Sequence, residues 1–145
     1  MEVKILDREL VEVSFEDLNN FSETRMINLP RKIVLNFFDK ETVIGFVSFE
    51  MRYFNKNAYI TYYLIPEERN KGKGKKILNL AIDFAFKELN LERITAEVYE
   101  YNEKSIRLLE KFGFQLEGRI RKGKYHDGKY HDILIYGLMK EERAG

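Results

Sequence analysis

The segment of the sequence that decides the fold is Arg69-Asn70-Lys71-Gly72-Lys73-Gly74-Lys75-Lys76. Aromatic and β-branched residues precede it and a helical period follows it, so it joins a strand to a helix. Its two glycines let the backbone approach an anion closely and adopt positive φ. The N–H groups at the start of the coming helix favour negative charge at the same place, and the lysines add electrostatic attraction. The segment therefore predicts a loop that binds a phosphate or pyrophosphate group, against the alternative of a solvated basic turn.

Two common phosphate-binding loops do not match this segment. A P-loop ends in Gly-Lys-Ser or Gly-Lys-Thr, whereas the last glycine here is followed by two lysines. The dinucleotide fingerprint needs a third glycine, which is missing. A nucleotide-dependent kinase or ATPase is therefore not favoured.

The residues on either side of the loop predict the neighbouring elements. Three stretches before it are rich in aromatic and β-branched residues and predict an antiparallel meander over 32–38, 43–53 and 58–65. After the loop, apolar residues spaced by three and four predict a helix over Lys75–Leu89, and Arg93–Tyr99 is typical of a strand. At the N-terminus we expect a strand within Val3–Val13 and a short helix that begins near Ser14.

The C-terminal part of the chain predicts one more helix and a hairpin. Asn102 is a typical N-cap residue and Gly113 a typical helix stop. Asp127-Gly128 then predicts a hairpin between strands over 114–125 and 129–139. This order of elements predicts an α+β fold in a single domain, residues 1–145, with helices packed on a mixed, mostly antiparallel sheet.

Composition argues against several classes of protein. The 145 residues are 44% hydrophobic, which suffices for one core, and no apolar run is long enough to span a bilayer. The 25 basic and 24 acidic residues leave a net charge of +1, which argues against a nucleic-acid-binding domain. With no cysteine and two histidines, we expect no disulfide, no thiol nucleophile and no metal site. The absence of a signal-peptide pattern after Met1 adds an expectation of a cytoplasmic location.

Two motifs of the sequence resemble the GNAT N-acetyltransferases. Arg69–Gly74 reads Arg-x-x-Gly-x-Gly between a strand and a helix, as in the acyl-CoA pyrophosphate loop of that superfamily. Asn102–Phe114 is similar to its second signature, Asn-x-x-Ser/Ala-x-x-Leu-Tyr-Glu-Lys-x-Gly-Phe. The resemblance runs from Val43 to the C-terminus and implies a GNAT-like fold.

The C-terminal tail is most similar to the RimJ/RimL-like branch of this superfamily. The features that match are Glu117-Gly118-Arg119, Asp127-Gly128-Lys129-Tyr130, Asp132 and Tyr136-Gly137-Leu138. That branch includes acetyltransferases of ribosomal-protein N-termini and resembles those of polyamines and amino sugars.

The resemblance implies an acetyl-CoA-dependent N-acetyltransferase. We expect the acetyl group to pass to a primary amine (a protein N-terminus, a polyamine or an amino sugar) by direct attack within a ternary complex. The expected cosubstrate is acetyl-CoA and the expected partner is the acceptor amine, with no nucleic acid, no membrane, and a homodimer left open. The alternative is a non-catalytic acyl-CoA-binding module on the same fold.

The resemblance also implies a set of residues that bind the cosubstrate. The main chain before the loop would pair with the pantetheine arm as an added strand does. The loop would hold the pyrophosphate, and Asn102 would contact the pantetheine or the sugar, unless it serves only as an N-cap. The expected binding residues are Leu64, Ile65, Arg69, Lys71, Gly72, Lys73, Gly74, Lys75 and Asn102.

Acetyl transfer needs a neutral amine, so a base must remove a proton. Glu97 lies at the position of the base in RimI-like acetyltransferases, and the alternative is a solvent-facing strand residue. Glu50 is the second candidate, and we expect Glu100 to be a surface residue.

The leaving thiolate calls for a proton donor, and the tyrosine of many relatives is replaced by Leu109. Ser105 is the hydroxyl that remains in the motif, and its alternative role is local hydrogen bonding at the helix start. Tyr125 and Tyr136 are further candidate donors. His126 and His131 flank the hairpin, and we interpret them as surface residues rather than as part of the acceptor site.

Overall fold

The computed structural model describes residues 30–143. The expected N-terminal strand and helix lie outside this range. The first described elements form an antiparallel meander of β1 (Lys32–Asp39), β2 (Thr42–Arg52) and β3 (Asn57–Leu64). This confirms the predicted meander, whose strands are rich in residues that suit a pleated, half-buried surface.

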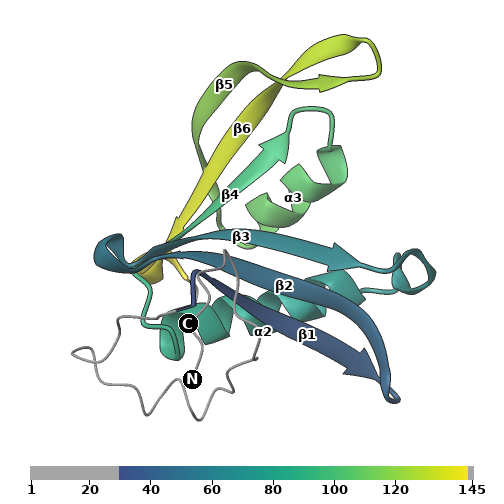
Figure 1. The fold of residues 1–145 in the computed structure, drawn as a ribbon, viewed down its shortest axis with the longest axis vertical. Helices are drawn as coiled ribbons and strands as arrows, with labels where there is room; N and C mark the ends of the chain where they lie inside the picture. The colour runs from purple at the N-terminus through teal and green to yellow at the C-terminus, as the bar shows by residue number, and fades with distance from the viewer. Residues whose placement is uncertain (1–29, 144–145) are drawn as a thin grey trace, which may run out of the picture.

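The second half alternates helices with strands. Helix α2 (Lys73–Lys87) leads to β4 (Arg93–Tyr99), and α3 (Glu103–Lys111) leads to the hairpin of β5 (Gln115–His126) and β6 (Lys129–Met139). Single turns of 3₁₀ helix follow β2, β3 and β6 at Tyr53–Asn55, Pro66–Glu68 and Lys140–Glu142. The six strands form one sheet in the order β1-β2-β3-β4-β6-β5, and Figure 1 shows the β5–β6 hairpin projecting beyond the helices. The α+β class and the mixed, mostly antiparallel sheet are therefore confirmed.

Helix α2 begins two residues earlier than the sequence pattern predicts. Gly72 is its N-cap, with φ of 79° and ψ of 0°, and the N–H of Lys76 donates to the Gly72 carbonyl. Lys73 and Gly74 therefore lie in the first helical turn rather than in the loop. The apolar period could not reveal this, because the first turn of the helix carries only lysines and a glycine.

The core forms between the sheet and one face of α2. The buried residues of α2 are Ile77, Leu78, Ala81, Ile82, Ala85 and Phe86. They pack with the buried side chains of β2 and β3, among them Val47, Phe49 and Ile60. Full burial of a leucine, isoleucine or phenylalanine side chain contributes about 1.5–3 kcal/mol, so this face holds α2 firmly against the sheet. No described helix is long and apolar enough to cross a membrane.

The sheet opens between its two central strands. β3 and β4 are parallel, but they pair only where Asn57–Tyr59 of β3 lies beside Arg93–Thr95 of β4. Beyond these residues β3 remains paired with β2, and β4 with β6. The two strands diverge toward their C-terminal ends, with α2 and α3 beginning near the two ends (Figure 1).

Candidate active site

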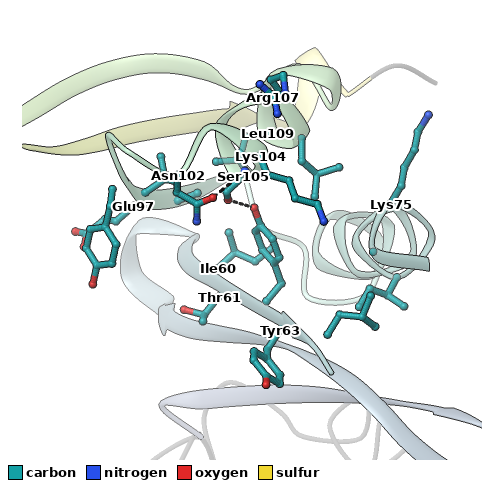
Figure 2. Close-up of a pocket in the computed structure, with 18 of the residues that line it drawn as sticks. Ile60, Thr61, Tyr63, Lys75, Glu97, Asn102, Lys104, Ser105, Arg107 and Leu109 are labelled. Atoms are coloured by element: carbon teal, nitrogen blue, oxygen red, sulfur yellow. Dashed lines mark hydrogen bonds between the residues drawn. The ribbon is translucent and has the colours of Figure 1, made fainter. Parts of the chain in front are cut away.

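A pocket of about 1140 Å³ lies where β3 and β4 separate. Its walls come from both strands, from the start of α2 and from α3. Figure 2 shows Lys75 on one side of this space and Lys104, Ser105 and Arg107 on the other. Of the residues expected to bind the cosubstrate, the lining includes Leu64, Arg69, Gly72, Gly74, Lys75 and Asn102.

The pocket passes through the sheet, because it is lined by residues from both faces. On β3, Ile60 and Tyr62 lie on the side of the helices, and Thr61 lies on the opposite side, as alternation along a strand requires. On β4, Val98 lies on the helix side and Glu97 on the opposite side. All five residues line the pocket. One ligand can therefore enter from the helix side while a second approaches from the other face.

The start of α2 offers unpaired backbone donors to this pocket. The N–H groups of Lys73, Gly74 and Lys75 lie in the first turn, where an α-helix provides no internal acceptor. No side chain caps them within the described residues. A Cβ added to Gly72 would meet no atom of residues 30–143 within 4 Å, so these residues leave the space beside the N-cap open. Open space beside free N–H groups at a helix N-terminus suits a phosphate group.

The lysines of this segment differ in where their charges lie. The Lys73 ammonium donates to Glu68, and to Asp39 Oδ2 at 3.0 Å, and does not line the pocket. These hydrogen bonds hold the pKa of Asp39 and of Glu68 below their usual range and raise that of Lys73. Lys71 Nζ lies 3.9 Å from Glu68 Oε2, also outside the lining. The sequence predicts that both lysines attract the anion, but their ammonium groups lie near carboxylates outside the lining, and Lys75 is the lysine of the segment that lines the pocket.

Two side chains tie the loop to its surroundings. Arg69 Nε donates to the Leu64 carbonyl at 2.8 Å, and its guanidinium lies 5.3 Å from the centre of the Tyr63 ring. Lys104 Nζ donates to Asn70 Oδ1 at 2.9 Å and so links α3 to the loop. Ile65 uses its N–H to pair with the Ile44 carbonyl of β2 at 2.8 Å and does not line the pocket. Its expected contact with the cosubstrate therefore remains a prediction without support from the lining.

Asn102 and Ser105 lie together at the start of α3. Asn102 Oδ1 accepts a hydrogen bond from the Ser105 N–H at 3.2 Å, so the residue is an N-cap and also lines the pocket (Figure 2). The Ser105 hydroxyl is hydrogen-bonded to the Tyr62 hydroxyl. Burial raises the pKa of Tyr62, so its phenol remains neutral in the physiological range. The sequence alone does not indicate a role for Tyr62, because nothing local distinguishes it among nine tyrosines.

Both candidate bases, Glu97 and Glu50, line the pocket, and they differ in their side-chain partners. The Glu97 side chain is exposed, lines the pocket, and has no hydrogen bond or ion pair to any residue within 30–143. Glu50 also lines the pocket, with Arg52 Nη2 3.8 Å from its Oε2. Glu100 lies outside the lining and pairs with Arg119 at 3.2 Å, in agreement with its interpretation as a surface residue.

The other candidate donors lie away from the pocket. Tyr136 is buried and donates to Glu110 Oε1 at 3.1 Å, whereas Tyr125 packs edge-on against Tyr130 in the hairpin. The rings of His126 and His131 pack against Tyr101, and their centroids lie 4.9 and 4.7 Å, respectively, from the centroid of the Tyr101 ring. None of these residues lines the pocket. Within residues 30–143, no group of three or more His, Asp or Glu is arranged to hold a metal ion.

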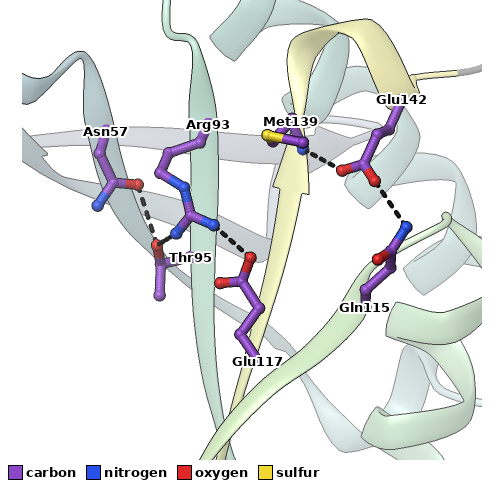
Figure 3. Close-up of polar contacts among 7 residues, drawn as sticks. All are labelled: Asn57, Arg93, Thr95, Gln115, Glu117, Met139 and Glu142. Carbon is purple, nitrogen blue, oxygen red and sulfur yellow. Dashed lines mark hydrogen bonds and ion pairs between the residues drawn. The ribbon is translucent and has the colours of Figure 1, made fainter.

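The tail features singled out in the sequence form polar contacts outside the pocket. Glu117 accepts from Arg93, which also donates to Thr95 Oγ1 at 2.8 Å (Figure 3). A Cβ on Gly137 would overlap the Glu117 carboxyl, so this glycine leaves the room that the carboxylate occupies. Arg119 likewise pairs with Asp132 at 2.8 Å. These tail residues therefore join strands, and this role could not be read from the order of the residues.

The chain matches known proteins over most of its length. A model of the acetyltransferase (GNAT) family matches residues 4–114. The SPbeta prophage-derived uncharacterized N-acetyltransferase YokL of Bacillus subtilis is 39% identical over 89 residues, or 60% of this chain and 50% of the relative. The spermidine N(1)-acetyltransferase of Vibrio cholerae is 31% identical over 109 residues, or 74% of this chain and 62% of the relative. The chain thus spans about half to three fifths of the length of these curated relatives.

Solved structures show the same fold. Spermidine N-acetyltransferase from Vibrio cholerae in complex with CoA and spermine matches with a TM-score of 0.74 and 25% sequence identity. The match covers 90% of this chain and 78% of that chain. The GNAT fold expected from the two motifs is confirmed.

Proposed function

The chain belongs to the acetyltransferase (GNAT) family, and we propose that it transfers the acetyl group of acetyl-CoA to a primary amine. The observation that carries this proposal is the pocket between β3 and β4. It brings the first-turn N–H groups of α2 and the Glu97 carboxylate, which have no side-chain partners within residues 30–143, into one space that opens on both faces of the sheet. That arrangement suits a reaction in which the two substrates meet without a covalent enzyme intermediate.

The helix side of the pocket suits the cosubstrate. Acetyltransferases of this family use acetyl-CoA, which supplies an activated acetyl group as a thioester. The first turn of α2 would bind the pyrophosphate through backbone N–H groups, with Lys75 adding charge. Leu64 and Asn102 flank the path between the two helices and would contact the pantetheine arm.

The opposite side of the pocket suits the amine. Glu97 would take a proton from the ammonium group, directly or through one water, because only the neutral amine can attack the thioester carbonyl. The amine nitrogen bonds to the acetyl carbon and gives up its second proton to water. The carbon–sulfur bond breaks with its electron pair on sulfur, the thiolate takes a proton from solvent, and Glu97 returns its own proton to solvent. Glu50 lines the same pocket and offers a second carboxylate to a cationic acceptor, which would compete there with Arg52, 3.8 Å from Glu50 Oε2.

Among primary amines, we propose a polyamine-like acceptor. Two carboxylates, Glu50 and Glu97, line the pocket, and a molecule with several ammonium groups can engage both. The relative from Vibrio cholerae is named for spermidine, which has this chemistry. A protein N-terminus, as in the RimJ/RimL-like branch, is the second candidate, and an amino sugar is the third. The branch rests on tail residues such as Glu117 and Asp132, which lie outside the pocket and do not support a choice of acceptor.

Four further expectations remain predictions. They are the assignment of residues 1–145 to one domain, the cytoplasmic location, the absence of a nucleic-acid or membrane partner, and a homodimer.

The test is a panel of amines assayed by release of the CoA thiol. Spermidine and spermine are compared with N-terminal peptides, an aminoglycoside and a monoamine of similar length. We expect turnover with amines, and the highest kcat/KM with the polyamines. Turnover restricted to peptides would refute the acceptor class but retain the activity. Tight CoA binding without turnover of any amine would establish the alternative, a non-catalytic acyl-CoA-binding module.

A further inference from the structure

The helix side of the pocket contains two side-chain hydroxyls, Tyr62 and Ser105, and they are bonded to each other. The remaining hydroxyls of the described lining, on residues such as Thr61 and Tyr99, belong to the opposite face of the sheet. The bond joins β3 to α3 across the opening between the strands. It lies where the acyl end of a ligand would pass from the helix side to Glu97.

The surroundings of this pair are apolar. Ile60, Leu108 and Leu109 also line the pocket, and Leu109 is fully buried. Weak screening strengthens a hydrogen bond in such a place. Burial also keeps the Tyr62 phenol neutral, so its O–H is available as a donor.

Either hydroxyl could donate in this hydrogen bond, and we infer the direction from the chemistry of the two groups. A phenol O–H is more acidic than an alcohol O–H and is the better donor, so Tyr62 donates and Ser105 Oγ accepts. The hydrogen of Ser105 is then free to point elsewhere. A serine early in a helix often donates to the carbonyl of the preceding turn, but the structure shows no such bond for Ser105 among the described residues. Its hydrogen therefore remains available to the pocket.

We propose that Tyr62 is a positioning residue that orients the Ser105 hydroxyl as a hydrogen-bond donor to the sulfur of the acyl-CoA thioester. This rests on the function proposed above. As the amine nitrogen bonds to the acetyl carbon, the carbon–sulfur bond breaks and its electron pair stays on sulfur. Ser105 donates a hydrogen bond to the thiolate as it forms. The nitrogen gives up its second proton to water, and the thiolate takes a proton from solvent when it leaves. Tyr62 acts only through Ser105.

The variants form a double-mutant cycle. Ser105→Ala removes the donor to sulfur, and a hydrogen bond to a charged group predicts a loss of about 10–100-fold in kcat. Tyr62→Phe keeps Ser105 but removes the hydrogen bond that orients its hydroxyl, and it should lower kcat by about 3–10-fold. The double variant should equal Ser105→Ala alone. Additive losses would show that Tyr62 acts independently and would overturn the proposal.

Tyr136→Phe is the matched control. Tyr136 also donates from a strand to α3, at Glu110, but lies outside the pocket. Any general loosening of α3 would affect both tyrosine variants. An equal loss of kcat in Tyr136→Phe and Tyr62→Phe would therefore mean that Tyr62 only anchors the helix.

A binding experiment tests the same contact without turnover. Affinities of CoA and of desulfo-CoA, which lacks the sulfur, are measured by calorimetry from pH 6 to 9. Because the hydroxyl stabilises the thiolate, CoA should gain on desulfo-CoA as the pH rises, and Tyr62→Phe and Ser105→Ala should reduce this gain. The other charged groups lining the pocket are unchanged in these variants: Glu50, Arg52, Arg69, Lys75, Glu97, Lys104, Arg107 and Lys111.

The two proposals fail in different ways. The protein could acetylate no amine and still prefer CoA to desulfo-CoA at high pH, with that preference lost in Tyr62→Phe. This result would refute the proposed function and retain the Tyr62–Ser105 contact with sulfur. Normal acetylation with an unchanged preference in both variants would refute only the contact.

Discussion

Replacing Gly72 by alanine separates the binding role of this residue from its conformational role. Gly72 has φ of 79° at the start of α2, and an added Cβ would meet no atom of the described part of the chain within 4 Å. Gly128, in the β5–β6 turn, has φ of 78° and equally open surroundings. The two glycines therefore present the same backbone problem, but only Gly72 lines the pocket.

The two alanine variants should lose the same stability. A residue with a side chain at positive φ costs about 1–2 kcal/mol, and the reduced freedom of the unfolded chain offsets about 0.4–1 kcal/mol of this. The expected net loss is about 1 kcal/mol for each variant. For a domain of this size it corresponds to a fall of about 4 °C in Tm.

The affinity for CoA should differ sharply between the two variants. In Gly72→Ala a methyl group projects into the open space where the pyrophosphate would lie, and a displaced phosphate loses at least one hydrogen bond from the first turn of α2. A hydrogen bond to a charged group contributes about 1.5–3 kcal/mol, so we expect affinity to fall by about 10–100-fold. Gly128→Ala should leave it unchanged. Gly72→Glu adds a carboxylate beside the phosphates and should abolish binding.

Calorimetric titration with CoA, after thermal unfolding has shown that each variant is folded, measures both effects. Unchanged affinity in folded Gly72→Glu would exclude this loop as the pyrophosphate site and with it the acyl-CoA assignment. Equal weakening in Gly72→Ala and Gly128→Ala would trace the loss to backbone strain and refute the argument from open space.

Three further predictions concern individual side chains. Glu97→Gln should lower turnover by about 10²–10⁴-fold with nearly unchanged acetyl-CoA affinity, and the deficit should shrink as pH rises because more acceptor is neutral; wild-type turnover from pH 6 to 9 would show an ordinary strand residue. Lys73→Ala should weaken CoA binding only slightly, since its charge is engaged outside the pocket; a loss of several hundred-fold would contradict this. The pKa values of its partners Asp39 and Glu68 are lowered in the folded protein, so both carboxylates stabilise the fold fully above their ordinary pKa values of 3.8 and 4.5. This stabilisation is lost as the pH falls through their lower pKa values in the folded protein. The stability of Lys73→Ala should therefore depend less steeply on pH in acid. Gly137→Ala should lower the free energy of unfolding by about 0.5–1 kcal/mol, because it displaces the partly exposed Glu117 from Arg93. Urea unfolding should show almost no such decrease when Gly137→Ala is combined with Glu117→Ala.

The sequence by itself determined the elements and the family. Strand composition, the helical period of α2, the Asn102 cap, the Gly113 stop and the Asp127-Gly128 turn are signals that act within a few residues, so they can be read along the chain. The bounds of α2 were less well determined. A glycine at positive φ begins this helix, and no apolar residue marks its first turn.

Only the tertiary structure decided which side chains work together. Tyr62 and Ser105 are 43 positions apart, and Lys73 and Asp39 are 34 positions apart. Nothing in the local sequence separates Tyr62 from the other tyrosines, or Lys73 from its neighbouring lysines. The same holds for Glu117 and Gly137, whose contact depends on the irregular register of β5 against β6. The pairing of strands fixes which face each residue occupies, and the divergence of β3 from β4 creates the pocket; both depend on contacts between distant segments, which a local pattern does not encode.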